Sequence, residues 1–320
     1  MKLQKWLLTR YNPRVASARA LPVLNHQRFT SSATPSTNRH RPLEPLQDGN
    51  IDYFREKCFV PERPTILPRQ FFRDIPAVER WFRPGTTQND TPRLRLNIEY
   101  LEQHGPNAFV PLELTQPSTS ESTNSELSFR QFHAPLSLFL QWMQTAETNP
   151  QQSTRLYLAQ CQLSDLPQIL RDDFPVPNIV TRAGRGDVYD ANVWIGHPPT
   201  YTPLHRDPNP NLFVQMAGGK VVRLVSPDDG LGLFATVRRQ LGRSGNREAA
   251  AIRGEEMMQG PERALLEKVV WGDADTQDSD KEWYEVCLGP GDGLFIPKGW
   301  WHSIKGVGEG VTASVNWWFR

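Results

Sequence analysis

The chain has 320 residues, 38% of them hydrophobic, which is enough to bury one sizeable core or two small ones. Its 36 basic and 35 acidic residues nearly cancel, and its apolar runs are too short to span a bilayer. The three cysteines lie far apart without a Cys-x-x-Cys pair, which argues against a disulfide framework or a cysteine zinc site.

The N-terminal segment is basic and contains no acidic residue before Glu44. This composition is typical of a transit peptide and predicts a mitochondrial leader in residues 1–32, followed by a linker over residues 33–50. The alternative is a disordered basic tail on a cytoplasmic or nuclear protein. Loss of residues 1–32 would remove six of the 36 basic residues and leave 30 against 35 acidic ones, so we expect no general affinity for nucleic acid.

From Ile51 onward the pattern is that of a folded domain, which we place at residues 51–320. Apolar spacing and proline positions predict helices over Ile51–Phe59, Pro76–Phe82 and Leu136–Thr145. Extended patterns predict strands over Thr65–Leu67, Arg93–Tyr100 and Arg155–Ala159. The segment 116–128 is rich in serine and threonine, which favours an exposed loop.

The C-terminal half is a series of short strands separated by proline and glycine turns. We expect these strands over Ala191–Ile195, Leu204–Asp207, Leu212–Met216, Val221–Val225, Trp283–Leu288, Gly293–Pro297, Trp301–Ile304 and Val311–Trp318. Such spacing predicts a mainly β sandwich, barrel or jelly roll. Between residues 228 and 280 the composition changes, and helices over Leu233–Gln240 and Gly254–Trp271 predict a helical insertion within the sheet.

A metal site is predicted by a His-x-Asp pair on one of these strands. Side chains at positions i and i+2 of a strand share a face, so His205 and Asp207 project together. The third ligand is expected to be His302, on a later strand. His197 is the alternative, but it occupies a Gly-His-Pro-Pro turn. Two histidines and one carboxylate form the triad of non-haem Fe(II) oxygenases, which leaves coordination positions free.

An Fe(II) oxygenase that uses 2-oxoglutarate also needs a cation for the far carboxylate of that cosubstrate. Lys220 and Arg223 are the candidates, and because they are three residues apart on one strand they face opposite ways. Thr202 and Tyr157 offer hydroxyl groups to the same carboxylate. The remaining polar residues in otherwise apolar strands are Asn211 and Asn316, whose buried amides must find hydrogen-bond partners.

Three segments together resemble the JmjC family of 2-oxoglutarate oxygenases: TPLHRDPNPNLFVQMAGGK over residues 202–220, GPGDGLFIPKGWWH over residues 289–302, and VNWW over residues 315–318. Within the family the similarity is greatest to small cupin-type hydroxylases such as the asparaginyl hydroxylase that inhibits hypoxia-inducible factor. The resemblance implies a double-stranded β-helix with iron on His205, Asp207 and His302. It also implies that Tyr157, Thr202 and Lys220 hold the far carboxylate of 2-oxoglutarate, with Asn211 and Asn316 near its metal-binding end.

The expected function is a 2-oxoglutarate-dependent dioxygenase that uses Fe(II) and O₂ to hydroxylate a protein or small-molecule substrate. The alternatives are an N-methyl-lysine demethylase of the JmjC type and a metal-binding cupin without oxygenase activity. A wall of tryptophans would keep water from the iron, and the sequence offers Trp194, Trp300, Trp301, Trp317 and Trp318 for it. The substrate and the oligomeric state stay open at this point.

Overall fold

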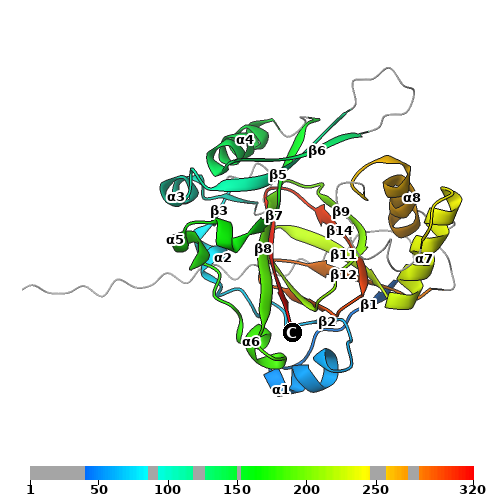
Figure 1. Cartoon of the computed structure of the whole chain (residues 1–320). Helices are drawn as coiled ribbons and strands as arrows, with labels where there is room; N and C mark the ends of the chain where they lie inside the picture. Colours follow the sequence, from blue (N-terminus) through cyan, green and yellow to red (C-terminus); the bar gives the residue numbers. More distant parts are fainter. Residues whose placement is uncertain (1–39, 86–92, 118–126, 150–152, 246–256, 273–280) are drawn as a thin grey trace, which may run out of the picture. The chain divides into compact units, whose positions relative to one another are not determined.

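Two sheets of mainly antiparallel strands form the centre of the domain (Figure 1). The computed structural model describes residues 40–85, 93–117, 127–149, 153–245, 257–272 and 281–320. The first sheet has five strands in the order β1 (His40–Pro42), β12 (Trp283–Leu288), β11 (Gly219–Val225), β14 (Trp301–Val307) and β9 (Tyr201–Arg206). Only the contact of β1 with β12 is parallel in this sheet.

The second sheet has eight strands, and a short third sheet pairs β3 (Phe82–Pro84) with β4 (Leu94–Leu96). The order of the eight is β2 (Thr65–Ile66), β13 (Gly293–Ile296), β10 (Asn211–Ala217), β15 (Thr312–Phe319), β8 (Val188–Gly196), β7 (Arg155–Gln162), β5 (Phe109–Pro117) and β6 (Leu127–Pro135). Along β2, β13, β10, β15 and β8, neighbours in this order are far apart in sequence, as in a jelly roll.

Side chains alternate across each strand, so the two central sheets have an inner and an outer face. Phe213 of β10 packs with Val222 and Leu224 of β11 in the cluster between the sheets. Leu212 and Val214, on either side of Phe213 in β10, point to the other face and into a larger core. This confirms the expected mainly β jelly roll with flanking helices.

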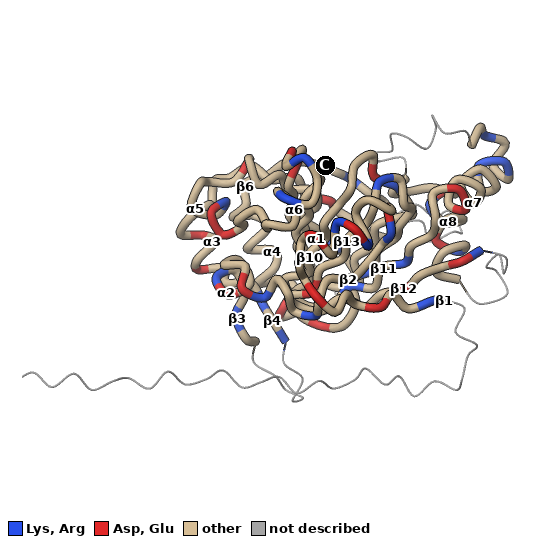
Figure 2. The backbone as a smooth tube through the Cα atoms, turned by 90° about the horizontal axis from the view of Figure 1, so that it is seen from below, with Lys and Arg blue, Asp and Glu red and all other residues tan. Residues whose placement is uncertain are grey.

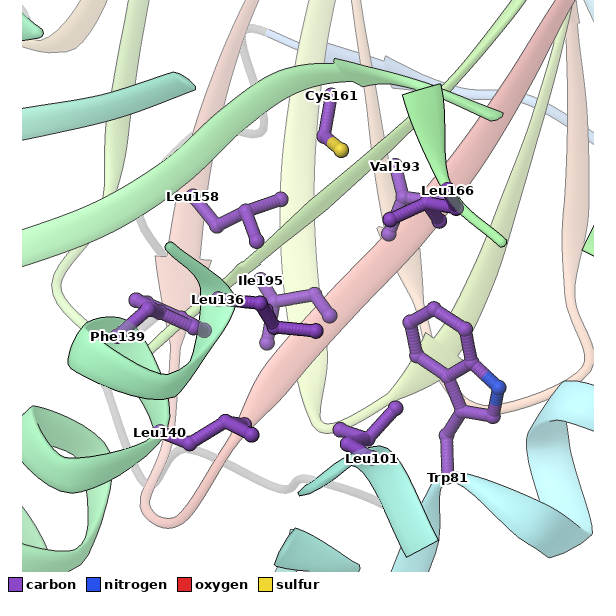
Figure 3. A pocket seen from close by; sticks show the side chains of 10 residues that line it. All are labelled: Trp81, Leu101, Leu136, Phe139, Leu140, Leu158, Cys161, Leu166, Val193 and Ile195. Atoms are coloured by element: carbon purple, nitrogen blue, oxygen red, sulfur yellow. The ribbon is translucent and has the colours of Figure 1, made fainter. Parts of the chain in front are cut away.

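The larger core lies between the eight-stranded sheet and the N-terminal helices. These are α1 (Ile51–Phe54) with its π-helical extension η1 (Arg55–Phe59), α2 (Pro76–Arg80), α3 (Ile98–His104), α4 (Leu136–Thr148), the 3-10 turn η2 (Leu163–Asp165), α5 (Gln168–Arg171) and α6 (Asn178–Ala183). A void of about 10 Å³ lies in this core. Figure 3 shows the side chains around it, which come from α3, α4, β7 and β8 together with Trp81 and Leu166. A void this small and apolar is a packing defect rather than a binding site.

Two further helices cover the five-stranded sheet from the opposite side (Figure 1). Helix α7 (Pro227–Gln240) begins at Ser226, whose hydroxyl accepts from the Asp229 amide, and α8 (Gly260–Trp271) follows. They pack on the outer face of β9 and β14 through a cluster that includes Leu204, Phe234, Leu266 and Trp301. Both helices lie between β11 and β12 in the chain and, apart from the first residue of α7, within the segment 228–280 expected to hold a helical insertion.

Most of the predicted elements are present, and the structure differs from the expectations at three places. Arg93–Tyr100 is not one strand: β4 ends at Leu96, and the Asn97 side chain then accepts from the Tyr100 amide and caps α3. The hairpin of β5 and β6 was not predicted; most of the loop expected over residues 116–128 lies outside the described residues, and only its two ends belong to β5 and β6. Part of the expected linker, His40–Pro42, pairs with β12 as an edge strand.

The distribution of charged residues in the structure agrees with the nearly equal numbers of basic and acidic residues in the sequence. Figure 2 shows basic and acidic residues interspersed along the described elements. None of the described helices has the length and apolar character that a membrane crossing requires. The leader expected in residues 1–32 lies outside the described residues, so its targeting role stays a prediction.

Candidate metal and cosubstrate site

The two predicted histidine ligands are direct neighbours across two paired strands. His205 of β9 lies opposite His302 of β14, and their ring centroids are 4.2 Å apart. Asp207 follows β9, with its carboxylate oxygens 4.0 Å from His205 Nε2 and 3.7 Å from His302 Nε2. One potential ligand atom from each residue lies within 4.8 Å of the other two, so the structure brings the predicted triad together.

A β-bulge in β9 places Thr202 on the same face as His205. The pairing shifts by one residue between Ile304, opposite Thr202, and His302, opposite His205. Two β9 residues, Pro203 and Leu204, therefore lie opposite the single residue between Ile304 and His302. Proline cannot donate a ladder hydrogen bond, which is why a bulge forms at this position. Without it, positions 202 and 205 would face opposite ways.

Hydrogen bonds to backbone carbonyls orient both imidazole rings. His205 Nδ1 lies 2.9 Å from the Pro203 carbonyl oxygen, and His302 Nδ1 lies 3.1 Å from the Trp300 carbonyl oxygen. A carbonyl only accepts, so each Nδ1 carries the proton and each Nε2 keeps a lone pair. Both lone pairs are on the nitrogens nearest Asp207, and carbonyl support of this kind is usual for metal-binding histidines.

The ionisation states also suit a divalent cation. His302 is 2% exposed, and this burial, together with the nearby His205, lowers the pKa of its imidazole to about 4. Burial alone would raise the pKa of the Asp207 carboxyl, but the two imidazoles and hydrogen bonds from Trp318 and Asn211 lower it. A neutral imidazole and an ionised carboxylate are the forms that bind metal, so these residues fit Fe(II) or a similar ion.

Two buried amides form a relay behind the carboxylate. Asn211 Nδ2 donates to Asp207 Oδ2 at 2.9 Å, and Asn316 Nδ2 donates to Asn211 Oδ1 at 3.0 Å. The carboxylate only accepts, so it fixes the orientation of the first amide, which in turn fixes that of the second. Both predicted asparagines thus lie in the site: Asn211 donates to the Asp207 carboxylate, and Asn316 orients Asn211.

Replacing Asn211 with alanine is expected to weaken metal affinity by about 10- to 100-fold, as is typical when an outer-sphere partner of a metal ligand is lost. The reason is that Asp207 would lose the donor that orients one of its oxygens. Titration of the purified variant with Co(II), followed by absorption, measures this. The matched change Asn178→Ala, on helix α6, should leave the affinity unchanged; equal affinities for all three proteins would contradict the relay.

The lysine expected to bind a carboxylate is buried inside the barrel. Lys220 of β11 is 2% exposed; its Nζ donates to Ser314 Oγ at 2.7 Å and lies 3.4 Å from the Tyr157 hydroxyl. Within the described part of the chain no carboxylate pairs with this amine. Burial lowers the pKa of Lys220 to about 7 and raises that of Tyr157, which therefore stays protonated. A buried amine among hydroxyl groups fits a carboxylate ligand.

The structure separates the other candidates from this site. Arg223 was the second candidate cation, but its guanidinium pairs with Glu285 at 2.7 Å on the outer face of the sheet. His197 bonds the Gly310 carbonyl oxygen and is not part of the triad. Ser314 was not predicted; its place two residues before Asn316 on the same strand was the available signal.

The expected tryptophan wall is only partly present. Trp301 and Trp317 are fully buried in the two outer cores, and Trp300 donates to the Glu62 carbonyl. Trp194 and Trp318 face each other with ring centroids 5.8 Å apart. They lie on the same strand faces as Asn192 and Asn316, which are paired across β8 and β15, so these two indoles border the site.

The affinity for 2-oxoglutarate is expected to fall by about tenfold or more as the pH rises from about 6.5 to about 8.5. The pKa of Lys220 in the free protein is lowered to about 7, and only the protonated amine attracts a carboxylate. Calorimetric titration of the metal-loaded protein across this range measures the effect. Lys220→Arg keeps a charge at every pH and should give a flat profile, and a flat wild-type profile would contradict the assignment.

A jelly-roll barrel that carries a His-Asp-His cluster on its inner face is typical of the cupin class of metal-binding proteins. The family model described as "Cupin-like domain" matches residues 52–320, so the chain belongs to this family.

Relatives of the chain carry JmjC and demethylase names. It is 26% identical over 254 residues to "Jumonji C domain-containing protein 5" of Drosophila melanogaster, covering 79% of this chain and 54% of that protein. It is 25% identical over 288 residues to "Lysine-specific demethylase 8" of Danio rerio, covering 89% and 60%. To "Lysine-specific demethylase JMJ30" of Arabidopsis thaliana it is 29% identical over 175 residues, covering 55% and 35%. The chain thus spans about a third to three fifths of the length of these relatives.

Proposed function

We propose that the chain is an Fe(II)- and 2-oxoglutarate-dependent oxygenase of the JmjC type. The observation that carries this proposal is the presence of a buried, carboxylate-free lysine in the same barrel as a His-Asp-His cluster. A metal-binding cupin of another kind has no need for Lys220 with Ser314 and Tyr157 around it. When bound, the iron and the keto acid supply the oxidation of a C–H bond with O₂, with succinate and CO₂ as coproducts.

The residues of this chain bind and orient the reactants. His205, Asp207 and His302 occupy one side of the metal and leave the other side open. Lys220 holds the far carboxylate, and Thr202 faces the same interior as His205. Trp194 and Trp318 narrow the access of water to the site.

Two buried amide oxygens, on β8 and β15 near the metal cluster, offer hydrogen-bond acceptors, and this favours a substrate with N–H groups. Asn192 is fully buried and donates to Asp190 at 2.8 Å, so its Oδ1 faces away from that carboxylate. Asn316 lies opposite it across the strand pair, and its Nδ2 is used by Asn211. For both amides, no described residue donates to Oδ1. Buried acceptors of this kind require a donor.

A basic side chain meets this requirement, because it brings N–H donors together with a charge that indole faces attract. The relatives named lysine-specific demethylases agree with such a substrate. Hydroxylation of an unmodified side chain and removal of an N-methyl group begin with the same C–H oxidation, and the geometry supports both. The resemblance to an asparaginyl hydroxylase predicts an asparagine side chain as another substrate, and its amide would also supply N–H donors.

Anaerobic addition of Fe(II) and 2-oxoglutarate tests the proposal directly. A visible charge-transfer absorption band is expected with the wild-type protein, followed by succinate formation when O₂ is admitted. Mass spectrometry of lysine, methyl-lysine, arginine and asparagine peptides then separates the substrates: gain of one oxygen indicates a hydroxylase, and loss of a methyl group with formaldehyde release indicates a demethylase. Absence of the band in protein that binds Fe(II) would favour a cupin without oxygenase activity.

A further inference from the structure

A hydrogen-bonded chain joins helix α8 to the strand beside the metal ligands. Trp271, the last residue of α8, donates from Nε1 to Ser303 Oγ at 2.9 Å. Ser303 in turn donates to the Thr202 carbonyl oxygen at 2.8 Å. Ser303 is fully buried and directly follows His302, with its side chain on the opposite face of β14.

The acceptor of this chain is the backbone of the bulge. Ser303 is the single β14 residue opposite Pro203 and Leu204, where the regular ladder is interrupted. Proline has no N–H to donate, so the Ser303 hydroxyl provides a connection across the gap in its place. The Thr202 carbonyl that it binds begins the segment that ends at His205, and the bulge within this segment turns both side chains to the interior.

Two cations lie against the Trp271 indole. The Arg223 guanidinium lies 4.4 Å and the Lys305 ammonium 4.8 Å from the ring centroid. Each cation is itself fixed by an acid, Arg223 by Glu285 at 2.7 Å and Lys305 by Glu267 at 3.1 Å. An indole face attracts cations, so these two contacts help to fix the orientation of the ring and with it the direction in which Nε1 donates to Ser303.

The packing of α7 and α8 gives the connection a rigid base. Leu204 of the bulge and Trp301, the neighbour of His302, are both fully buried against these helices. At Gly230 of α7 a Cβ atom would come within 2.1 Å of the Trp301 ring, so α7 lies in direct contact with β14. The residues next to two of the three triad members therefore rest on the insertion.

We propose that Trp271 is a positioning residue: through Ser303 it holds the Thr202 carbonyl, and with it the placement of Thr202 and His205 toward the metal and 2-oxoglutarate. This inference rests on the proposed function, because it assigns Trp271 to the geometry of that site. It gives the insertion between β11 and β12 a role in cosubstrate binding, although neither of its helices contributes a residue to the interior.

Trp271→Phe tests the role, since phenylalanine keeps an aromatic ring near Arg223 and Lys305 but lacks the N–H donor. In Co(II)-loaded full-length protein without O₂, titration with 2-oxoglutarate is followed by the visible absorption of Co(II). The dissociation constant is expected to rise about fivefold, as for one lost hydrogen bond. In turnover assays with Fe(II), KM for 2-oxoglutarate should rise similarly while kcat changes by less than about twofold.

Three further variants separate positioning from general packing. Trp283→Phe removes an indole from the same apolar cluster, has no link to Ser303, and should leave the titration unchanged. Ser303→Thr keeps the hydroxyl and should stay within about twofold of wild type, whereas Ser303→Ala should weaken binding at least as much as Trp271→Phe. Adding Trp271→Phe to Ser303→Ala should cause no additional loss, because both changes break one chain.

The outcomes distinguish the two proposals. If wild-type Co(II) protein gives no spectral response to 2-oxoglutarate, the proposed function fails, and the positioning role fails with it. If wild type responds and Trp271→Phe has the same affinity, only the positioning role is overturned. Equal losses in Trp271→Phe and Trp283→Phe, or additive losses in the double variant, would also overturn it.

Discussion

Replacing His302 with alanine is expected to lower Fe(II) affinity by more than about 100-fold, beyond the effect of losing an outer-sphere partner, and to stop 2-oxoglutarate turnover. Only His205 and Asp207 would remain, and two ligands from adjoining positions cannot enclose one side of a cation. The fold should persist, because the β14 ladder does not depend on this side chain. Metal titration measures the affinity, and circular dichroism checks the fold.

His197→Ala is the matched control for this experiment. His197 is partly buried and, like His302, has an Nδ1 that bonds a backbone carbonyl, but it lies outside the triad. Its removal should leave metal affinity and turnover within about twofold of wild type. Retention of Fe(II) by His302→Ala, or loss of Fe(II) in His197→Ala, would show that the metal is held elsewhere.

Replacing Lys220 with methionine is expected to affect stability and binding in opposite directions. Affinity for 2-oxoglutarate should fall by about 100-fold, because a desolvated charge-assisted bond to the carboxylate is lost. The free energy of unfolding should rise by at least about 1 kcal/mol, since the native fold no longer buries an amine whose pKa is lowered by desolvation to about 7. Calorimetric titration and urea denaturation measure the two effects.

The stability difference should depend on pH in a defined direction. The unfolded chain keeps the lysine proton up to about pH 10.5, whereas the native amine releases it near pH 7. Between these values the unfolded state binds more protons, so the wild-type protein gains stability as pH rises. The advantage of methionine is therefore largest below pH 7 and shrinks above it. Lys57→Met, at an exposed position paired with Glu56, should show neither effect.

Binding of a carboxylate ligand would explain why a lysine is kept at this buried position. A buried amine without a carboxylate among the described residues costs stability, and the cost persists only if a ligand makes use of it. If Lys220→Met proved less stable than wild type, the amine would have a structural role, and the assignment to 2-oxoglutarate would lose its main support.

Local sequence patterns predicted elements whose geometry depends on near neighbours. The proline at the start of α2 and the apolar spacing of α4 were sufficient to identify both helices. The pattern of Arg93–Tyr100 misled because its alternation fits a strand, while the Asn97 side chain ends β4 and begins a helix one residue later. The hairpin of β5 and β6 was not recognised, although its two strands are close in the chain and pair mainly with each other, because the serine- and threonine-rich segment between them favoured an exposed loop.

For the site, the sequence by itself determined which chemical groups are available and that His205 and Asp207 project together, because strand alternation is a local property. The resemblance already favoured Lys220 over Arg223; only the tertiary structure decided that Ser314 is the closest partner of Lys220, that Arg223 pairs with Glu285 on the outer face, and that Thr202 joins His205 on one face. These outcomes depend on strand register, on a bulge at Pro203, and on helices packed behind β14. Each of them is set by contacts between residues distant in the chain, and such contacts leave no periodic trace in the sequence.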